Sequence, residues 1–126
     1  MKTIHQRIKI KDVFNGYQDK NWDGVVGYDG KLDIRPIYQR EFIYNPENER
    51  AVMDTIMKEH PLNLMYWVKN GDNFEVLDGQ QRTLSFCRFL DHKYHIEING
   101  EKRYCDTLLK EDLDRILDYE LDVYIC

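Results

Sequence analysis

The feature that most constrains the fold is an apolar run that stops at a tight turn and continues as a helical pattern. The run covers residues 74–77, and the turn is Asp78-Gly79. Glycine permits the backbone angles that a tight turn needs, and the apolar positions after it recur at helical spacing up to about Leu90. The pattern predicts a strand that feeds directly into a helix over about 80–90.

The turn and the start of this helix have the chemistry of a phosphate-binding turn. The first N–H groups of a helix lack partners within it, and the helix dipole is positive there, so anions are favoured. Arg82 offers a planar fork for phosphate, and Asp78 can hold magnesium. Gln80 and Gln81 can bond a base edge, a phosphate oxygen or water. The same residues also fit an ordinary turn, in which Asp78 caps the helix and Arg82 is a surface cation.

Strand and helix patterns alternate along the rest of the chain. Asn45-Pro46-Glu47 predicts a helix start with a capping residue, proline at the first position and an acid in the first turn, and His60-Pro61 ends that helix. Further helices are expected near 11–17 and at 110–118, and strands at 25–28, 31–34, 62–68, 94–98, 101–105 and 121–126, with two-residue turns at Asp29-Gly30 and Asn99-Gly100. This mixture predicts an α+β fold.

The totals exclude several classes of protein. A chain of 126 residues is the size of one domain, and its net charge of −5 argues against a whole-surface attraction to nucleic acid. Nucleic-acid binding therefore needs a local basic patch, for which the candidates are Lys31, Arg35, Arg40, Arg82 and Arg88. No apolar stretch approaches the roughly 18 residues of a membrane span, so no membrane association is expected.

The cysteines and histidines predict neither a zinc site nor a redox cofactor. Cys87, Cys105 and Cys126 are odd in number and lack C-x-x-C spacing, which fits a reduced, cytoplasmic setting. His92 and His95 are expected to be a surface pair rather than metal ligands. The chain stops on an apolar strand without a polar tail, and we therefore expect residues 1–126 to be a single domain from a longer protein.

Two motifs together resemble a known family. Residues 34–40 read I-R-P-I-Y-Q-R and residues 76–82 read V-L-D-G-Q-Q-R, separated by a helix, an apolar strand, a turn and a second strand. This pair resembles the N-terminal domain of the GmrSD family of type IV restriction proteins, in the ParB/sulfiredoxin-like superfamily. The resemblance is clear over roughly residues 30–90. It implies a mixed sheet with flanking helices and two β-hairpins.

The resemblance also implies a function and a set of site residues. In the family, the D-G-Q-Q-R turn is linked to binding and hydrolysis of a nucleoside triphosphate with Mg²⁺, which powers or licenses cleavage of modified or foreign DNA. Carried over by position, the catalytic residues are Asp78, Gln80, Gln81 and Arg82, the nucleotide-binding residues are Arg35, Tyr38, Gln39, Arg40, Gly79 and Arg82, and Asp78 holds the metal. Gln39 and Arg40 would face the turn from across the sheet, and Arg40 would neutralise charge that develops during hydrolysis.

Departures from the family pattern leave alternatives open. The 126 residues contain neither the further helical motif of the family nor an HNH-type nuclease module, so a C-terminal or separate module would cleave DNA and the full-length protein would bind it. A non-hydrolysing DNA-binding module is the main alternative, and a bare structural domain is another. A sulfiredoxin-type enzyme is excluded because that turn needs a cysteine where Gln80 and Gln81 stand.

Overall fold

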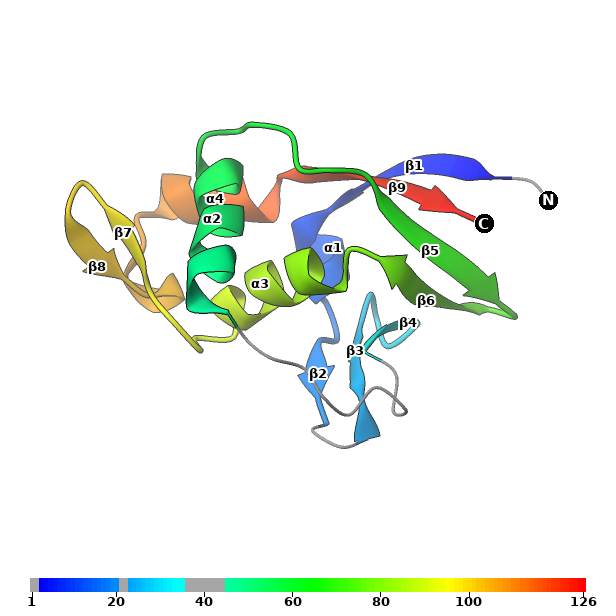
Figure 1. Cartoon of the computed structure of the whole chain (residues 1–126). Coiled ribbons are helices and arrows are strands. Elements are labelled where there is room, and N and C mark those ends of the chain that lie inside the picture. The colour runs from blue at the N-terminus through cyan, green and yellow to red at the C-terminus, as the bar shows by residue number, and fades with distance from the viewer. Residues whose placement is uncertain (1–2, 21–22, 36–44) are drawn as a thin grey trace.

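The computed structural model describes residues 3–20, 23–35 and 45–126. These residues form nine strands and four α-helices (Figure 1). In chain order the elements are β1 (Ile4–Lys9), α1 (Ile10–Phe14), β2 (Gln18–Asp19), β3 (Val25–Gly27), β4 (Leu32–Arg35), α2 (Pro46–Met57), β5 (Met65–Asn70), β6 (Asn73–Asp78), α3 (Gln80–Leu90), β7 (Ile96–Ile98), β8 (Glu101–Arg103), the 3-10 helix η2 (Cys105–Thr107), α4 (Lys110–Leu117) and β9 (Glu120–Ile125).

Seven of the strands form one mixed sheet. Their order is β1-β9-β5-β6-β4-β3-β2, while β7 and β8 pair with each other as a separate hairpin. Strands β4 and β6 are parallel neighbours, as are β5 and β9, and the remaining pairs are antiparallel. The prediction of an α+β fold built on a mixed sheet is confirmed.

The helices gather on one side of strands β1, β9, β5 and β6 (Figure 1). Helix α3 is buried on most of its circumference because α2 covers the side that the sheet does not. Its Phe86 and Phe89 pack in the core with Trp67 of β5 and Met53 of α2. The predicted start of α2 is confirmed, since the Asn45 side chain accepts hydrogen bonds from two backbone N–H groups of the first turn.

Both predicted hairpin turns are present, with different strand pairing around them. Asn99-Gly100 is the predicted two-residue turn, with both residues at positive φ, because Ile98 pairs directly with Glu101. Asp29 and Gly30 also have positive φ, and the Lys31 N–H closes the turn on the Tyr28 carbonyl at 3.1 Å, but the strand pairing stops at Gly27 and Leu32, one residue earlier on each side than predicted. The reason is that carbonyls at the end of α1 accept the N–H groups of residues 28 and 29, each at 2.7 Å, so the Tyr28 N–H is not available to the opposite strand.

Other differences lie at the ends of the sheet. Strand β1 was not predicted, and it forms because the C-terminal strand β9 lies inside the sheet and pairs with β1 on one side and β5 on the other. Helix α1 is shorter than the predicted 11–17. Strand β5 begins at Met65 and not at Leu62, because side chains from elsewhere in the fold bind the backbone at 62–64. No helix among the described residues is long and apolar enough to span a bilayer.

Candidate functional site

The predicted strand–turn–helix is present at residues 73–90. Strand β6 ends at Asp78, Gly79 has φ +107° and ψ +16°, and α3 begins at Gln80. This backbone conformation is one that residues with a Cβ rarely adopt, and a Cβ on Gly79 would lie 2.8 Å from the Cγ of Met65. The turn therefore needs glycine for its conformation and for the close approach of β5.

A β-bulge brings the Asp78 carboxylate to solvent. Trp67 pairs with Val76, whereas the preceding residue, Tyr66, pairs with Asp78, so Leu77 is the extra residue on β6. Without the bulge, Asp78 would share the face of the buried Met65. With it, the Leu77 residue is 66% exposed and the Asp78 side chain 63% exposed. The bulge thus turns an acid toward the solvent at the point where the strand ends.

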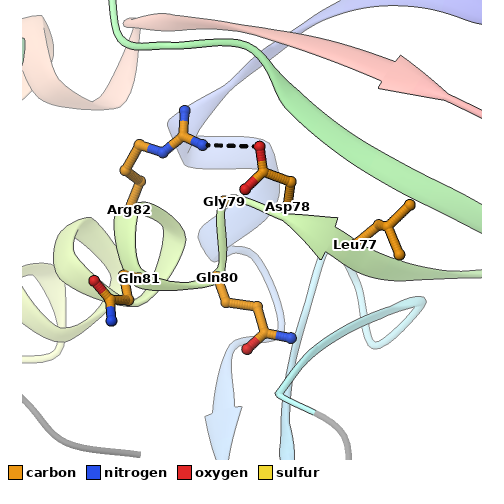
Figure 2. A pocket seen from close by; sticks show the side chains of 6 residues that line it. All are labelled: Leu77, Asp78, Gly79, Gln80, Gln81 and Arg82. Atoms are coloured by element: carbon orange, nitrogen blue, oxygen red, sulfur yellow. Dashed lines mark hydrogen bonds and ion pairs between the residues drawn. The ribbon is translucent and has the colours of Figure 1, made fainter.

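The start of α3 offers backbone donors to a pocket. The first backbone hydrogen bond of the helix runs from the N–H of Thr83 to the carbonyl of Gly79, at 2.9 Å. The N–H groups of Gln80, Gln81 and Arg82 precede it, and no side chain caps the helix, so Asp78 is not the cap that an ordinary turn would have. Residues 77–82 line an open pocket of about 430 Å³ over these groups (Figure 2).

Arg82 is an anchor and not a free surface cation. Its Nη1 donates to the carbonyls of Asn63 and Leu64, at 2.5 and 3.1 Å, and its Nη2 lies 3.5 Å from the Asp78 carboxylate. The side chain is only 19% exposed. These contacts leave the Nε–H and one Nη2 hydrogen for another acceptor. The sequence did not indicate the two carbonyls, because backbone partners of an arginine carry no signature in residue type.

The two glutamines point to the other side of the turn. Figure 2 shows the Asp78–Arg82 pair on one side of the start of α3 and the Gln80 and Gln81 side chains on the other. The amide of Gln80 donates to the carbonyl of Val76 at 3.4 Å, which holds it beside β6. Gln81 is exposed and its side chain extends into solvent. The acid and the cation therefore lie on one side of the turn, and the amides on the other.

The first motif begins on the strand next to β6. Strands β4 and β6 run parallel, with Asp33 beside Glu75, so Arg35 and Asp78 leave the sheet at the same edge. Ligands of such sheets bind outside the carboxyl ends of parallel strands. Arg35 is buried with its Nη2 4.0 Å from the Asp19 carboxylate. The predicted nucleotide-binding residues Tyr38, Gln39 and Arg40 lie outside the described residues.

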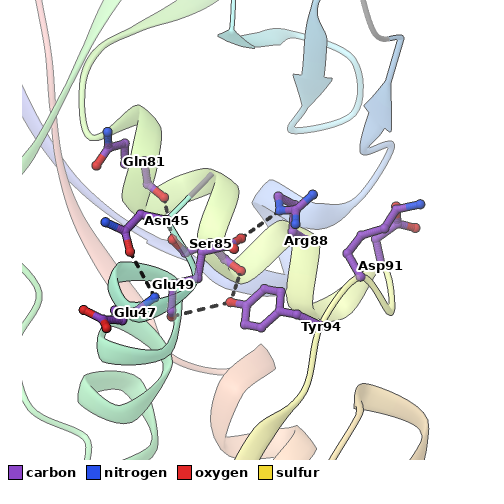
Figure 3. Close-up of polar contacts among 9 residues, drawn as sticks. Asn45, Glu47, Glu49, Gln81, Ser85, Arg88, Asp91 and Tyr94 are labelled. Carbon is purple, nitrogen blue, oxygen red and sulfur yellow. Dashed lines mark hydrogen bonds and ion pairs between the residues drawn. The ribbon is translucent and has the colours of Figure 1, made fainter. Parts of the chain in front are cut away.

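A buried polar network joins α3 to α2 behind the turn (Figure 3). The Nε of Arg88 donates to the carboxylate of Glu49 at 2.7 Å, and both side chains are largely buried. The Tyr94 hydroxyl donates to the carbonyl of Ser85 at 2.6 Å. Burial, followed by the charge of Glu49, raises the pKa of Tyr94 far above its usual range. The sequence did not indicate this network, because its members are distant along the chain.

Three of the five candidates for a basic patch have internal partners. Arg35 lies beside Asp19, Arg82 donates to carbonyls of the segment before β5, and Arg88 is held by Glu49, whereas Lys31 is exposed. Arg40 lies outside the described residues. Arg35 and Arg88, which pair with internal acids, are therefore poorly placed to contact the phosphates of a nucleic acid.

The chemistry of the remaining candidates is limited. Cys87 is a buried free thiol whose pKa is raised by burial and by the charge of Asp91, which opposes thiolate formation. His92 lies beside a carboxylate and His95 lies beside a tyrosine ring, so the two histidines do not share a partner. Over the ranges 3–20, 23–35 and 45–126, no group of three or more His, Cys, Asp or Glu side chains is placed to hold a metal ion.

The fold and the turn define an α+β domain with an uncapped helix N-terminus at the edge of two parallel strands. The family model described as GmrSD restriction endonuclease, N-terminal domain, matches residues 10–124. The chain belongs to this family, and it is thus a domain of a restriction enzyme, as the two motifs indicated. Comparisons with curated proteins and with solved structures gave no match.

Proposed function

We propose that this domain binds a nucleoside triphosphate at residues 78–82 and hydrolyses it to regulate DNA cleavage by another module of the restriction enzyme. The observation that carries the proposal is the uncapped start of α3 at the carboxyl edge of β4 and β6. Residues 80–82, which carry the first N–H groups of the helix, line the pocket there, and Arg82 keeps side-chain donors beyond its bonds to the Asn63 and Leu64 carbonyls. Oriented N–H groups at the positive end of a helix favour phosphate.

Magnesium suits the acid at this pocket. Among the described residues that line it, Asp78 is the one carboxylate, and its side chain is exposed. Mg²⁺ commonly takes one or two carboxylates, and phosphate oxygens and waters complete its coordination. A metal held jointly with the phosphates would also offset the repulsion between the Asp78 charge and the anion. Gln80 and Gln81 would orient the attacking water or contact the base.

Family membership supports the coupling to DNA. In this proposal the domain acts together with a separate module that cleaves DNA, and we assign DNA binding to the full-length protein in the cytoplasm. The net charge of −5 and the arginines engaged with internal acids argue that this domain is not itself the main DNA-binding surface. Its proposed part is regulatory.

Calorimetric titration with ATP, GTP, CTP and UTP, with and without Mg²⁺, tests the proposal. We expect saturable binding that Mg²⁺ strengthens. Asp78→Asn should remove the Mg²⁺ dependence with little change in stability, because the carboxylate is exposed, caps nothing and makes only a long ion pair with Arg82, at 3.5 Å. Asp72→Asn is the matched control, since Asp72 is an exposed acid in the turn at the opposite end of β6.

Arg82→Ala needs a stability measurement alongside. We expect it to weaken triphosphate binding by about 1.5–3 kcal/mol, the scale of a hydrogen bond to a charged group. It should also lower the free energy of unfolding, because the carbonyls of Asn63 and Leu64 lose their donor. Absence of binding by all four nucleotides to the unaltered protein would contradict the proposal. A salt-dependent DNA titration would then test the DNA-binding module instead.

A further inference from the structure

Three aromatic rings form a row on the sheet face that the helices leave uncovered. His5 of β1 pairs in register with Tyr124 of β9, and Tyr124 pairs with Tyr66 of β5, so the three side chains share one face. The ring centroids of Tyr66 and Tyr124 are 5.7 Å apart with planes 24° from parallel, and those of His5 and Tyr124 are 5.0 Å apart. The Tyr66 and Tyr124 rings are stacked, the His5 ring is tilted by 45° against Tyr124, and Tyr66 is the last ring of the row among the described residues.

The stack ends beside the phosphate turn. Tyr66 pairs in register with Asp78, so the side of the Tyr66 ring away from Tyr124 faces β6. The bulge puts Leu77 and Asp78 there, and Leu77 is a largely exposed apolar side chain that also lines the pocket. Adjacent strands lie about 4.8 Å apart, so a planar group stacked on Tyr66 would lie over β6, within one strand spacing of Asp78.

We propose that Tyr66, at the end of the His5–Tyr124–Tyr66 stack, binds the nucleobase of the nucleotide whose phosphates lie at residues 78–82. This inference rests on the proposed function, and it assigns the nucleobase to the sheet face that carries Tyr66. A base would stack on the free side of the Tyr66 ring, with Leu77 beneath it and the ribose and phosphates leading to the start of α3. Stacking of a base on an aromatic ring is a recurrent mode of nucleotide recognition.

Charged groups flank the row at both ends. The carboxylate of Asp122 lies 3.0 Å from a His5 ring nitrogen and 3.6 Å from the Arg7 Nε, and Asp78 pairs in register with Tyr66. A neutral planar group on Tyr66 would add no charge beside the Asp78 carboxylate. Because every base has a π-face, stacking alone predicts little discrimination among the four bases.

The test compares a nucleotide with a ligand that has phosphates and no base. Mg²⁺-ATP and Mg²⁺-tripolyphosphate are titrated into the protein and into Tyr66→Leu. We expect Tyr66→Leu to weaken ATP binding about tenfold to a hundredfold, the range for loss of one base–aromatic stack, and to leave tripolyphosphate affinity unchanged. Tyr66→Phe keeps the ring and should bind ATP as the unaltered protein does.

Tyr104→Leu is the matched control. Tyr104 is an exposed tyrosine whose ring lies 5.6 Å from that of His95, and it follows the separate β7–β8 hairpin. It should leave both affinities unchanged. An equal loss of ATP and tripolyphosphate binding in Tyr66→Leu would overturn the proposal, because Tyr66 would then act through the shape of the turn.

Other outcomes also decide between the two claims. Unchanged ATP affinity in Tyr66→Leu would overturn the base site alone and leave the phosphate site intact. Loss of affinity for a single-stranded oligonucleotide without loss of ATP affinity would assign the stack to nucleic acid and not to the nucleotide. Failure of the unaltered protein to bind either ATP or tripolyphosphate would overturn the proposed function, and the base site with it.

Discussion

At the scale of single residues, Arg82 and Gly79 set the geometry of the turn. Arg82 ties the turn to the segment before β5 through two carbonyls, and Gly79 lets Met65 of β5 approach the backbone. A residue whose type suggested phosphate binding therefore also holds the site together. Its substitution alone would not separate binding from folding, so the tests of phosphate binding rely on the exposed Asp78 as well.

Gly79→Ala tests the close approach at the turn. We expect it to lower the free energy of unfolding by about 2–3 kcal/mol, from the strained φ and from the contact with Met65. Gly71→Ala is the control, because Gly71 also has positive φ but has no heavy atom within 4 Å of an added Cβ. Urea denaturation of both variants measures the difference, and an equal loss in the two would mean that Met65 moves aside without cost.

Because of Tyr94, the free energy of unfolding should fall at alkaline pH. Its pKa in the folded protein lies above the value of about 10 in the unfolded chain, so its contribution is complete below pH 10 and is lost as the pH rises toward the folded value. Between the two pKa values, this group should reduce the free energy of unfolding by about 1.4 kcal/mol per pH unit.

Tyr94→Phe isolates that contribution. At neutral pH the variant should lose about 1 kcal/mol, because the Ser85 carbonyl loses its hydrogen bond. Above pH 10 its stability should fall less steeply than that of the unaltered protein, as chemical denaturation at pH 7, 10 and 11 would show. If the free energy of unfolding fell equally with pH in the two proteins, the raised pKa of the buried Tyr94 hydroxyl would be contradicted.

At the scale of elements, the contact between α2 and α3 depends on an ion pair as well as on apolar packing. Glu49 lies in the first turn of α2, and Arg88 lies near the end of α3. The side chains are 7% and 17% exposed. Because the two charges are buried together, loss of one partner leaves the other uncompensated in a poorly solvated place.

A double variant tests whether the protein needs the ion pair itself or only needs each buried charge to have a partner. Arg88→Met should lower the free energy of unfolding by about 3–5 kcal/mol, because it strands the Glu49 carboxylate. Glu49→Leu with Arg88→Met should recover most of that loss, since apolar residues often replace a buried pair at little cost. Urea denaturation of the single and double variants gives the comparison, and losses that simply add would contradict the account.

At the scale of the whole molecule, local signals predicted the strand–turn–helix at 74–90 better than they predicted the sheet. The strand, glycine turn and helix at 74–90 and the cap at Asn45 depend on neighbouring residues, and the structure contains them. Strand β1 has little apolar alternation, and it exists because β9 presents an edge more than a hundred residues later in the chain, as the pairing of Ile4 with Ile125 illustrates. Such pairings have no local signature.

The same contrast separates the site residues. The types and order of residues 78–82 indicated phosphate chemistry, but the bulge that exposes Asp78 depends on how β5 pairs with β6. The stack that ends at Tyr66 needs three strands in register. Both features follow from the tertiary arrangement of the sheet, so reading the residues in sequence could not reveal them.

The most direct test of the central claim is to follow the backbone amide resonances of Gln80, Gln81 and Arg82 while Mg²⁺-ATP is added. The account predicts that these three N–H signals shift most, and in a saturable manner, because they are the donors at the uncapped start of α3. Saturable binding that leaves these three resonances in place would contradict the phosphate site at the turn.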